Sequence, residues 1–340
     1  MKKALITGIT GQDGFYLTKL LIKKGYKVFG FARRNSQMSW GSLESLEKKE
    51  FNAIEMRWGD IIDHTYMEKI IQEIKPDEIY HLAAQSFVGL SFENPKLTYD
   101  VNISGTLNLL NAVKEFSPKS KVYFAATSEL YGKVKESPQN EKTPFYPRSP
   151  YGISKLAGFW TMINYRDCYD LICSNGILFT HESEMRGSEF VTRKISRGIA
   201  NIVAGKQKLL ELGNLNAKRD WGHAEDYVYA MWQILQEDKY GDYVIATGEN
   251  RSVREFVEAG FKAVKISITW EGEGINEIGK HSETKEILIK INPKFFRPTD
   301  VEVLLGDASK AKAKFGWEPK VTFDELVKRM VKADIERIKC

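Results

Sequence analysis

A short apolar run followed by regularly spaced glycines restricts the possible folds of this chain more than any other feature. Residues 4–7 read Ala-Leu-Ile-Thr and predict a buried strand, and residues 8–14 read Gly-Ile-Thr-Gly-Gln-Asp-Gly before an amphipathic helix from about Phe15 to Lys24. Glycines three residues apart let the backbone turn tightly and approach a pyrophosphate at a helix N-terminus. Such turns also occur without a ligand, so the pattern by itself leaves both interpretations open.

Strands and helices alternate along the chain after this turn. Apolar strands are predicted at 27–31, 53–58, 78–86, 122–126 and 172–179, and helices at 67–75, 96–116 and 149–170. This order predicts an α/β Rossmann fold with a doubly wound, mostly parallel sheet, and a smaller mixed α/β substrate domain at its C-terminal side. The expected limits are 1–178 plus about 223–248 for the dinucleotide-binding domain, and about 179–222 and 249–340 for the smaller domain.

The end of the second predicted strand indicates which dinucleotide binds. Arg33 and Arg34 follow that strand, about twenty residues after the glycines. A carboxylate here would hold the ribose 2′-hydroxyl of NAD, whereas arginine accommodates the 2′-phosphate of NADP. We therefore predict NADP, with two solvated arginines at the start of a loop as the alternative. The next strand ends at Gly59-Asp60, which can flank the adenine.

Four polar residues between Thr127 and Lys155 are the candidate catalytic group. Thr127 and Glu129 follow an apolar run and are expected at the carboxyl end of a buried strand, where open α/β sheets bind their ligands. Tyr151 and Lys155 are four residues apart behind the helix start Ser149-Pro150, so they share one helical face. We expect all four side chains to face one crevice. A solvated carboxylate at the strand end is the alternative for Glu129.

Charge and cysteine content argue against several classes of protein. The formal net charge is only +5 and no Lys/Arg block is present, so we predict an anionic small-molecule ligand and no nucleic-acid partner. Three cysteines without a Cys-x-x-Cys pair indicate neither disulfides nor a thiolate metal site. His181 beside Glu182 lacks the spacing of metal ligands. Without a signal-peptide core or a membrane span, the protein is expected to be soluble and cytoplasmic.

Basic residues in the second half of the chain are candidate ligands for a diphosphate. Lys194 belongs to a predicted helix, Arg219 to a polar loop bounded by glycine, and Arg297 to the sequence Phe-Arg-Pro. Guanidinium groups match phosphate oxygens in geometry. For each residue taken alone, a surface salt bridge is the alternative.

Taken together, these patterns resemble the extended branch of the short-chain dehydrogenase/reductase superfamily and, more narrowly, the GDP-mannose 4,6-dehydratase family. The narrower resemblance rests on stretches that span nearly the whole chain. They are 8–14, 127–132 (Thr-Ser-Glu-Leu-Tyr-Gly), 143–151 (Thr-Pro-Phe-Tyr-Pro-Arg-Ser-Pro-Tyr), 190–194 (Phe-Val-Thr-Arg-Lys), 218–223 (Lys-Arg-Asp-Trp-Gly-His) and 296–298 (Phe-Arg-Pro). The resemblance implies a hydro-lyase that converts GDP-mannose, or a close GDP-manno sugar, into the GDP-4-keto-6-deoxy sugar and water.

The resemblance also implies an internal redox cycle on a tightly bound, recycled NADP. Tyr151 takes the proton of the sugar 4-hydroxyl as hydride leaves C4, while Lys155 lowers the pKa of the phenol and holds the nicotinamide ribose. Glu129 then removes the C5 proton and protonates the departing 6-hydroxyl, and Thr127 binds the C4 oxygen. Hydride finally returns to C6.

Two sets of binding residues carry over from the family. The set expected around the cofactor is Gly8, Thr10, Gly11, Gln12, Asp13, Gly14, Arg33, Asp60, Ile61, Leu82, Ala84, Ser86, Tyr151, Lys155, His181 and Arg186. The set expected around the GDP-sugar is Ser86, Thr180, Val191, Lys194, Gly213, Arg219 and Arg297. We also expect a homodimer or homotetramer.

The chain departs from the family pattern in the segment 180–187. The family usually reads Asn-His-Glu-Ser-Pro-Arg-Arg-Gly there, whereas this chain reads Thr-His-Glu-Ser-Glu-Met-Arg-Gly, and it has Asp300 where Glu is usual. Thr180 replaces a side chain that would face the sugar, and Glu184-Met185 removes a cation and adds an anion. The sugar therefore stays open between mannose and a modified manno sugar such as a heptose.

Two other functions stay open on the same scaffold. A nucleotide-sugar 4-epimerase or 4-ketoreductase would share Thr127, Tyr151 and Lys155 but would not require Glu129. A catalytically silent nucleotide-binding protein would need none of the four. The complete set of four argues against the silent protein, and Glu129 favours the dehydratase.

Overall fold

The structure, a computed structural model, describes residues 1–34, 36, 39–296 and 303–339. Its largest element is a seven-stranded sheet in the order β11-β6-β5-β4-β1-β2-β3, with each neighbouring pair parallel. The strands are β1 (Lys3–Thr7), β2 (Lys27–Ala32), β3 (Ile54–Trp58), β4 (Glu78–His81), β5 (Lys121–Thr127), β6 (Ile172–Leu178) and β11 (Asp242–Ile245). The predicted doubly wound α/β fold is confirmed.

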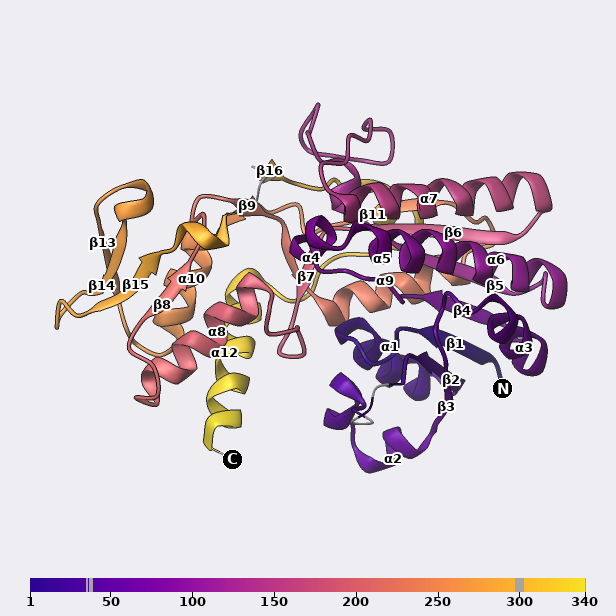
Figure 1. Ribbon diagram of the computed structural model, residues 1–340, viewed down its shortest axis with the longest axis horizontal. Coiled ribbons are helices and arrows are strands. Elements are labelled where there is room, and N and C mark those ends of the chain that lie inside the picture. The colour runs from indigo at the N-terminus through magenta and orange to yellow at the C-terminus, as the bar shows by residue number, and fades with distance from the viewer. Residues whose placement is uncertain (35, 37–38, 297–302, 340) are drawn as a thin grey trace.

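Helices cover both faces of this sheet (Figure 1). One face carries α3 (His64–Ile74), α6 (Gly105–Phe116) and α7 (Pro150–Tyr169), and the other carries α1 (Gln12–Lys23), α9 (Ala224–Gln236) and α11 (Ser309–Phe315). Alternate residues of one strand therefore enter different cores: Leu5 packs with the first group of helices and Ile6 with the second. This burial on both faces explains why the central strands read as continuous apolar runs.

The strand order reverses between β1 and β4. β2 and β3 extend the sheet on one side of this pair, and β5, β6 and β11 extend it on the other. Open α/β sheets bind ligands outside the carboxyl ends of the strands at such a point. Gly8, which follows β1, has a φ of 72°, and a Cβ atom there would lie 2.7 Å from the backbone nitrogen of Ala83 after β4. Only glycine allows this close approach.

A second group of elements lies beyond the carboxyl ends of the central strands, at the left of Figure 1. A four-stranded sheet in the order β13-β14-β15-β8 and three helices share a separate apolar core. The elements are β8 (Leu210–Leu212), β13 (Ile268–Glu271), β14 (Ile278–His281), β15 (Ile287–Ile291), α8 (Val191–Val203), α10 (Val253–Ala263) and α12 (Phe323–Lys339).

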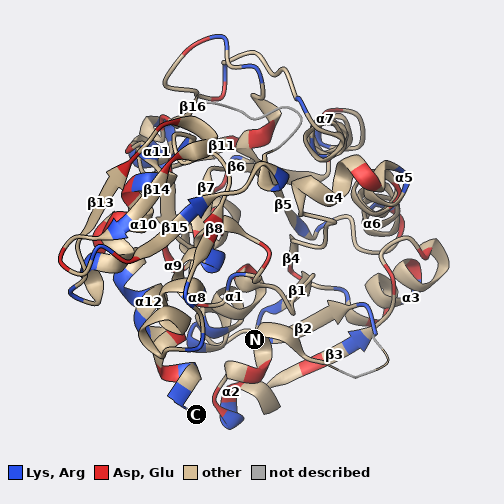
Figure 2. Cartoon of the chain, turned by 60° about the vertical axis from the view of Figure 1, so that its left-hand side comes forward, with Lys and Arg blue, Asp and Glu red and all other residues tan. Residues whose placement is uncertain are grey.

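Small sheets connect the two groups. β7 (Thr180–Glu182) pairs with β10 (Trp221–His223), and β9 (Lys218–Arg219) lies between β12 (Arg251–Ser252) and β16 (Val303–Leu304). The remaining short helices of the described segments are α2 (Lys48–Asn52), α4 (Val88–Glu93) and α5 (Pro95–Tyr99). None of the helices that the structure describes is long and apolar enough to cross a membrane. Figure 2 shows basic and acidic residues interspersed over the elements.

One predicted helix is interrupted. Instead of a single helix over 96–116, α5 ends at Tyr99 and a wider π-helical turn, Asp100–Ser104, precedes α6. In this turn the side chain of Asn102 donates hydrogen bonds to the carbonyl of Gln85 (3.1 Å) and to Ser154 Oγ (2.9 Å). Apolar periodicity does not reveal an inserted residue of this kind, because the flanking turns keep the helical pattern.

The predicted domain limits stay a prediction. Within the stretch 249–340, Ala311 of α11 and the following Trp317 are buried in the core that α1 and α9 form against the central sheet. We therefore propose that α11 belongs with the larger domain.

Candidate active site

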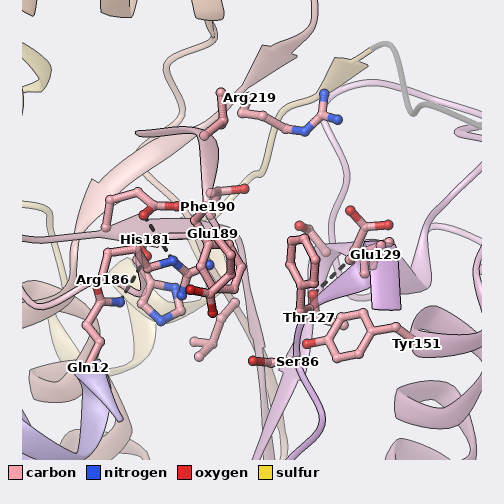
Figure 3. Close-up of a pocket in the computed structure, with 18 of the residues that line it drawn as sticks. Gln12, Ser86, Thr127, Glu129, Tyr151, His181, Arg186, Glu189, Phe190 and Arg219 are labelled. Atoms are coloured by element: carbon pink, nitrogen blue, oxygen red, sulfur yellow. Dashed lines mark hydrogen bonds and ion pairs between the residues drawn. The ribbon is translucent and has the colours of Figure 1, made fainter. Parts of the chain in front are cut away.

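A cavity of about 670 Å³ opens where the carboxyl ends of the central strands meet the smaller sheets (Figure 3). All four candidate catalytic residues line it, together with most residues expected around the cofactor and the sugar. The lining members of those two expected sets are Gly8, Gly11, Gln12, Asp13, Gly14, Leu82, Ala84, Ser86, Tyr151, Lys155, Thr180, His181, Arg186, Val191, Lys194, Gly213 and Arg219.

Four expected cofactor residues are not among the residues that line the cavity: Thr10, Arg33, Asp60 and Ile61. Arg33 is exposed beyond the end of β2. The Ile61 side chain is 4% exposed and packs in the core, where a Cβ atom on Gly105 would come within 2.7 Å of it. The predicted sugar residue Arg297 and the substituted position Asp300 lie outside the described residues.

The two halves of the catalytic group are held by backbone caps. Thr127 ends β5, and its Oγ1 accepts a hydrogen bond from the backbone N–H of Glu129 (3.3 Å) at the start of the 3₁₀ turn Ser128–Leu130. Ser149 caps α7, because its Oγ accepts a hydrogen bond from the Gly152 N–H (3.0 Å). These caps set Thr127 and Glu129 beside the Tyr151 ring at the cavity wall (Figure 3).

Burial and neighbouring groups shift the pKa values of the Tyr151 phenol and the Lys155 ammonium. Burial raises the pKa of Tyr151 to about 12, the hydrogen bond with Thr127 lowers it, and the Glu129 carboxylate raises it further. Burial lowers the pKa of Lys155 to about 7, and its Nζ lies 4.4 Å from the centroid of the Phe124 ring. The hydrogen bond with Thr127 and the charge of Arg186 both lower the pKa of Tyr151 and so favour the phenolate.

A buried carboxylate orients Arg186 on the opposite wall. Glu182 is 2% exposed, accepts a hydrogen bond from Thr192 Oγ1 (2.7 Å) and lies 3.1 Å from Arg186 Nε. The guanidinium also lies over the Phe190 ring, 3.5 Å from its centroid. Glu182 was not among the predicted site residues, because spacing of four residues indicates an ion pair only within a helix and Glu182 ends strand β7.

The diphosphate candidates lie at the far end of the cavity. Arg219 belongs to β9, and its neighbour Asp220 is fully buried and accepts hydrogen bonds from the N–H groups of Thr247 (2.7 Å) and Gly248 (2.9 Å). These bonds hold β9 in place beneath Arg219. Lys194 Nζ lies 3.1 Å from the centroid of the Phe295 ring. Both cations can therefore contact an anion in the cavity.

Of the three residues in segment 180–187 that depart from the family pattern, Thr180 lines the cavity, whereas Glu184 and Met185 do not. The Glu184 side chain turns toward His223, with 3.4 Å between Oε2 and Nε2. The sulfur of Met185 lies 3.8 Å from Arg337 Nη2. The added anion, Glu184, therefore does not line the cavity.

Several cavity residues were not proposed as site residues from the sequence. They come from the α4 region, from the segment before α8 and from loops of the smaller sheets. They include Phe87, Val88, Phe92, Glu93, Glu189, Phe190, Asn214, Trp221, Lys294, Phe295 and Phe296. In the described part of the chain, no group of three or more His, Cys, Asp or Glu residues is placed to hold a metal ion.

The turn between β1 and α1 fits a dinucleotide phosphate. Gly11 precedes the first residue of α1 and carries no side chain to cap it. The amide groups of the first helical turn can therefore bind an anion. A Cβ atom on Gly14 would lie 2.0 Å from the carbonyl oxygen of Ile9, so the helix packs as closely as glycine permits.

Comparisons with known proteins agree with this geometry. The family described as GDP-mannose 4,6 dehydratase matches residues 5–330. A GDP-mannose 4,6 dehydratase of Cricetulus griseus is 54% identical over 341 residues, which cover 98% of this chain and 92% of that protein. A GDP-mannose 4,6-dehydratase of Vibrio cholerae is 47% identical over 350 residues, covering 98% and 94%.

Solved structures share the fold at lower identity. A dTDP-glucose 4,6-dehydratase of Bacillus anthracis in complex with NAD has a TM-score of 0.81 and 23% identity, over 100% of this chain and 98% of that one. A UDP-glucose 4-epimerase of Thermus thermophilus in complex with NAD has a TM-score of 0.80 and 24% identity, over 98% of each chain. These two relatives show that one fold serves both reaction types.

Proposed function

The chain belongs to the GDP-mannose 4,6-dehydratase family and is a nucleotide-sugar 4,6-dehydratase, a hydro-lyase, and from this premise we propose that it acts on GDP-mannose or a close GDP-manno sugar with NADP as its cofactor. One observation carries the proposed chemistry. Glu129 lines the cavity beside Thr127 and Tyr151, so an acid-base group for elimination stands next to the groups for hydride transfer. The epimerase, the reductase and the silent protein are not favoured.

The proposed mechanism divides the work among the four residues. A nicotinamide dinucleotide held at the glycine turn would supply the site with a hydride acceptor that can also act as the donor. Tyr151 removes the 4-hydroxyl proton, and Thr127 donates a hydrogen bond to the C4 oxygen as it gains negative charge. The resulting ketone makes the C5 proton acidic. Glu129 removes that proton and delivers it to the departing 6-hydroxyl, which leaves as water. When hydride returns to C6, C5 takes up a proton, and the proton that Tyr151 removed from the 4-hydroxyl balances this step. Lys155 is buried on the same face of α7 as Tyr151, where it can hold the nicotinamide ribose.

The proposed binding of the cofactor and the sugar uses opposite ends of the cavity. The glycine turn and the start of α1 would hold the pyrophosphate of NADP, with His181 and Arg186 on the facing wall. Lys194 and Arg219 would hold the diphosphate of the GDP-sugar. The homodimer or homotetramer and the cytoplasmic location stay predictions.

Product mass tests the proposed function. The purified enzyme is incubated with GDP-mannose, a GDP-manno-heptose and nucleotide sugars with other bases, and products are analysed by mass spectrometry. We expect loss of water from a GDP-manno sugar without consumption of added NADPH. An unchanged mass with a new stereocentre would identify an epimerase, and consumption of NADPH would identify a reductase.

Cofactor preference should depend on Arg33. We expect Arg33→Ala to weaken NADP binding by about 10- to 100-fold and to leave NAD binding nearly unchanged, because a charge-assisted contact with the 2′-phosphate is lost. Titration of the cofactor-free protein with each dinucleotide measures both values. Arg34→Ala is the matched comparison and should have the smaller effect. A larger loss in Arg34→Ala would transfer the role to that residue.

A further inference from the structure

The start of α1 is bonded to the segment after β6 by four side chains that take no part in the proposed proton transfers. Gln12 Nε2 donates to the carbonyl of His181 (3.1 Å), and Ser183 Oγ donates to Gln12 Oε1 (2.8 Å). Asp13 Oδ2 lies 2.9 Å from His181 Nε2. These residues are about 170 positions apart in the chain, so only the fold brings them together. We call Gln12, Asp13, His181 and Ser183 the latch.

The hydrogen-bond partners of His181 determine its charge. Its Nδ1 lies 2.8 Å from the carbonyl oxygen of Phe179, and its Nε2 faces the Asp13 carboxylate. Both partners accept hydrogen bonds, so a proton on each ring nitrogen would satisfy both contacts, and this arrangement favours the imidazolium. Burial would lower the pKa of His181, but the Asp13 carboxylate outweighs it and the pKa is raised. The Tyr227 ring stacks on the imidazolium with 4.6 Å between centroids.

The Gln12–Ser183 half of the latch is shielded from solvent, whereas the side chains of Asp13 and His181 are 21% and 12% exposed. Ser183 is fully buried, and Gln12 is 7% exposed. Hydrogen bonds and ion pairs are stronger in such surroundings, and breaking one leaves a buried group without a partner. Gln12, Asp13 and His181 line the cavity, whereas Ser183 does not. Ser183 can therefore affect a ligand only through the other three residues.

The latch joins two walls that would enclose a dinucleotide. The glycine turn with the start of α1 forms one wall, and the segment that carries His181 and Arg186 forms the other. Figure 3 shows Gln12, His181 and Arg186 together on one side of the cavity, with Arg219 farther away. Moving these two walls apart would break the hydrogen bonds and the ion pair of the latch, whereas Arg219 at the other end of the cavity takes no part in them.

We propose that the latch retains the dinucleotide through successive turnovers, while the sugar enters and leaves at the other end of the cavity. The inference rests on the proposed function, in which the hydride taken from C4 returns to C6 of the same sugar. Loss of the reduced cofactor between these two steps would leave the reaction unfinished. Gln12, Asp13, His181 and Ser183 are thus positioning residues for the cofactor site.

Cofactor retention in Ser183→Ala tests the latch. The purified enzyme, loaded with NADP, is passed through gel filtration, and exchange of bound NADP for labelled NADP is followed over time. We expect about tenfold faster exchange in Ser183→Ala, because Gln12 loses one buried hydrogen bond. The variant also removes the acceptor of the Met185 N–H (3.1 Å), a loss that the control must reproduce. The matched control is Ser174→Ala on β6. Ser174 is 1% exposed, does not line the cavity, and its Oγ accepts a hydrogen bond from the Gly241 N–H (3.2 Å).

Each outcome decides for or against the latch. Exchange at the wild-type rate in Ser183→Ala, or equal acceleration in Ser174→Ala, overturns the inference. Excess NADP should restore turnover in Ser183→Ala. A loss of turnover that excess NADP does not restore would indicate general damage to the enzyme and would also contradict the inference. If no GDP-sugar loses water but Ser183→Ala still releases NADP faster, the proposed function fails and the latch stands.

Alkaline pH should also open the latch. The pKa of His181 is raised above 6.5 and that of Asp13 is lowered below 3.8, so the ion pair is complete between these values. It is lost as the pH rises through the raised pKa of His181. Arg186 and Glu182 are the other charged neighbours of His181, and Lys155 adds a titration near pH 7. Wild-type NADP exchange should therefore accelerate as the pH rises through the raised pKa of His181.

Asp13→Asn isolates the ion pair from the other titrating groups. Its amide can donate to the unprotonated Nε2 of a neutral His181, so a hydrogen bond remains without the charge. Exchange in this variant should be faster than in the wild type at pH 6 and should change less with pH. Identical pH profiles for the two proteins would contradict the imidazolium assignment.

Discussion

Glu129→Gln is expected to keep oxidation at C4 and to lower formation of the 6-deoxy product by about 100- to 10,000-fold. The amide can neither remove the C5 proton nor protonate the departing hydroxyl. The cap at Thr127 uses the backbone N–H of residue 129, so the substitution leaves it in place. In a single turnover with a GDP-manno sugar, absorbance should show reduced cofactor, and mass spectrometry should show no loss of water.

Glu136→Gln provides the control for this result. Glu136 is an exposed carboxylate on the loop between β5 and α7 and does not line the cavity. It should turn over at the wild-type rate. Normal turnover in Glu129→Gln would remove Glu129 from the elimination step and would reopen the epimerase and reductase interpretations.

Tyr151→Phe is expected to stop the reaction one step earlier, with turnover reduced by about 100- to 10,000-fold and no reduced cofactor formed. The phenol is the proposed base for the 4-hydroxyl proton, and the phenyl ring fills the same space without it. Tyr151 is 8% exposed, and burial raises its pKa to about 12, so contacts with Thr127 and the bound ligands must favour the phenolate. The same single-turnover absorbance experiment measures the effect.

The two variants together give the order of the steps. Reduced cofactor should accumulate in Glu129→Gln and be absent in Tyr151→Phe. Tyr146→Phe, at a tyrosine that is 48% exposed, is the control for loss of a phenol and should behave as the wild type. Reduced cofactor in Tyr151→Phe at the wild-type rate would assign the first proton transfer to another group.

Patterns within one element account for the parts of the fold that were predicted well. The alternation of apolar strands and amphipathic helices predicted the doubly wound sheet, and α7 (Pro150–Tyr169) agrees with the helix predicted over 149–170. The π-helical turn before α6 was missed, because one inserted residue scarcely changes a helical pattern. The domain limits involve packing between distant segments, and α11 shows that such packing does not follow chain order.

The sequence by itself determined the local geometry of the candidate site. The spacing of Tyr151 and Lys155 places them on one helical face, and a strand end places Thr127 and Glu129 together, since both relations depend only on helix and strand periods. The tertiary structure alone decided which distant side chains meet. It joined Gln12 to Ser183, turned Glu184 toward His223 and left Arg33 outside the cavity. Side-chain direction in loops depends on packing between elements, and no repeat in the sequence records that packing.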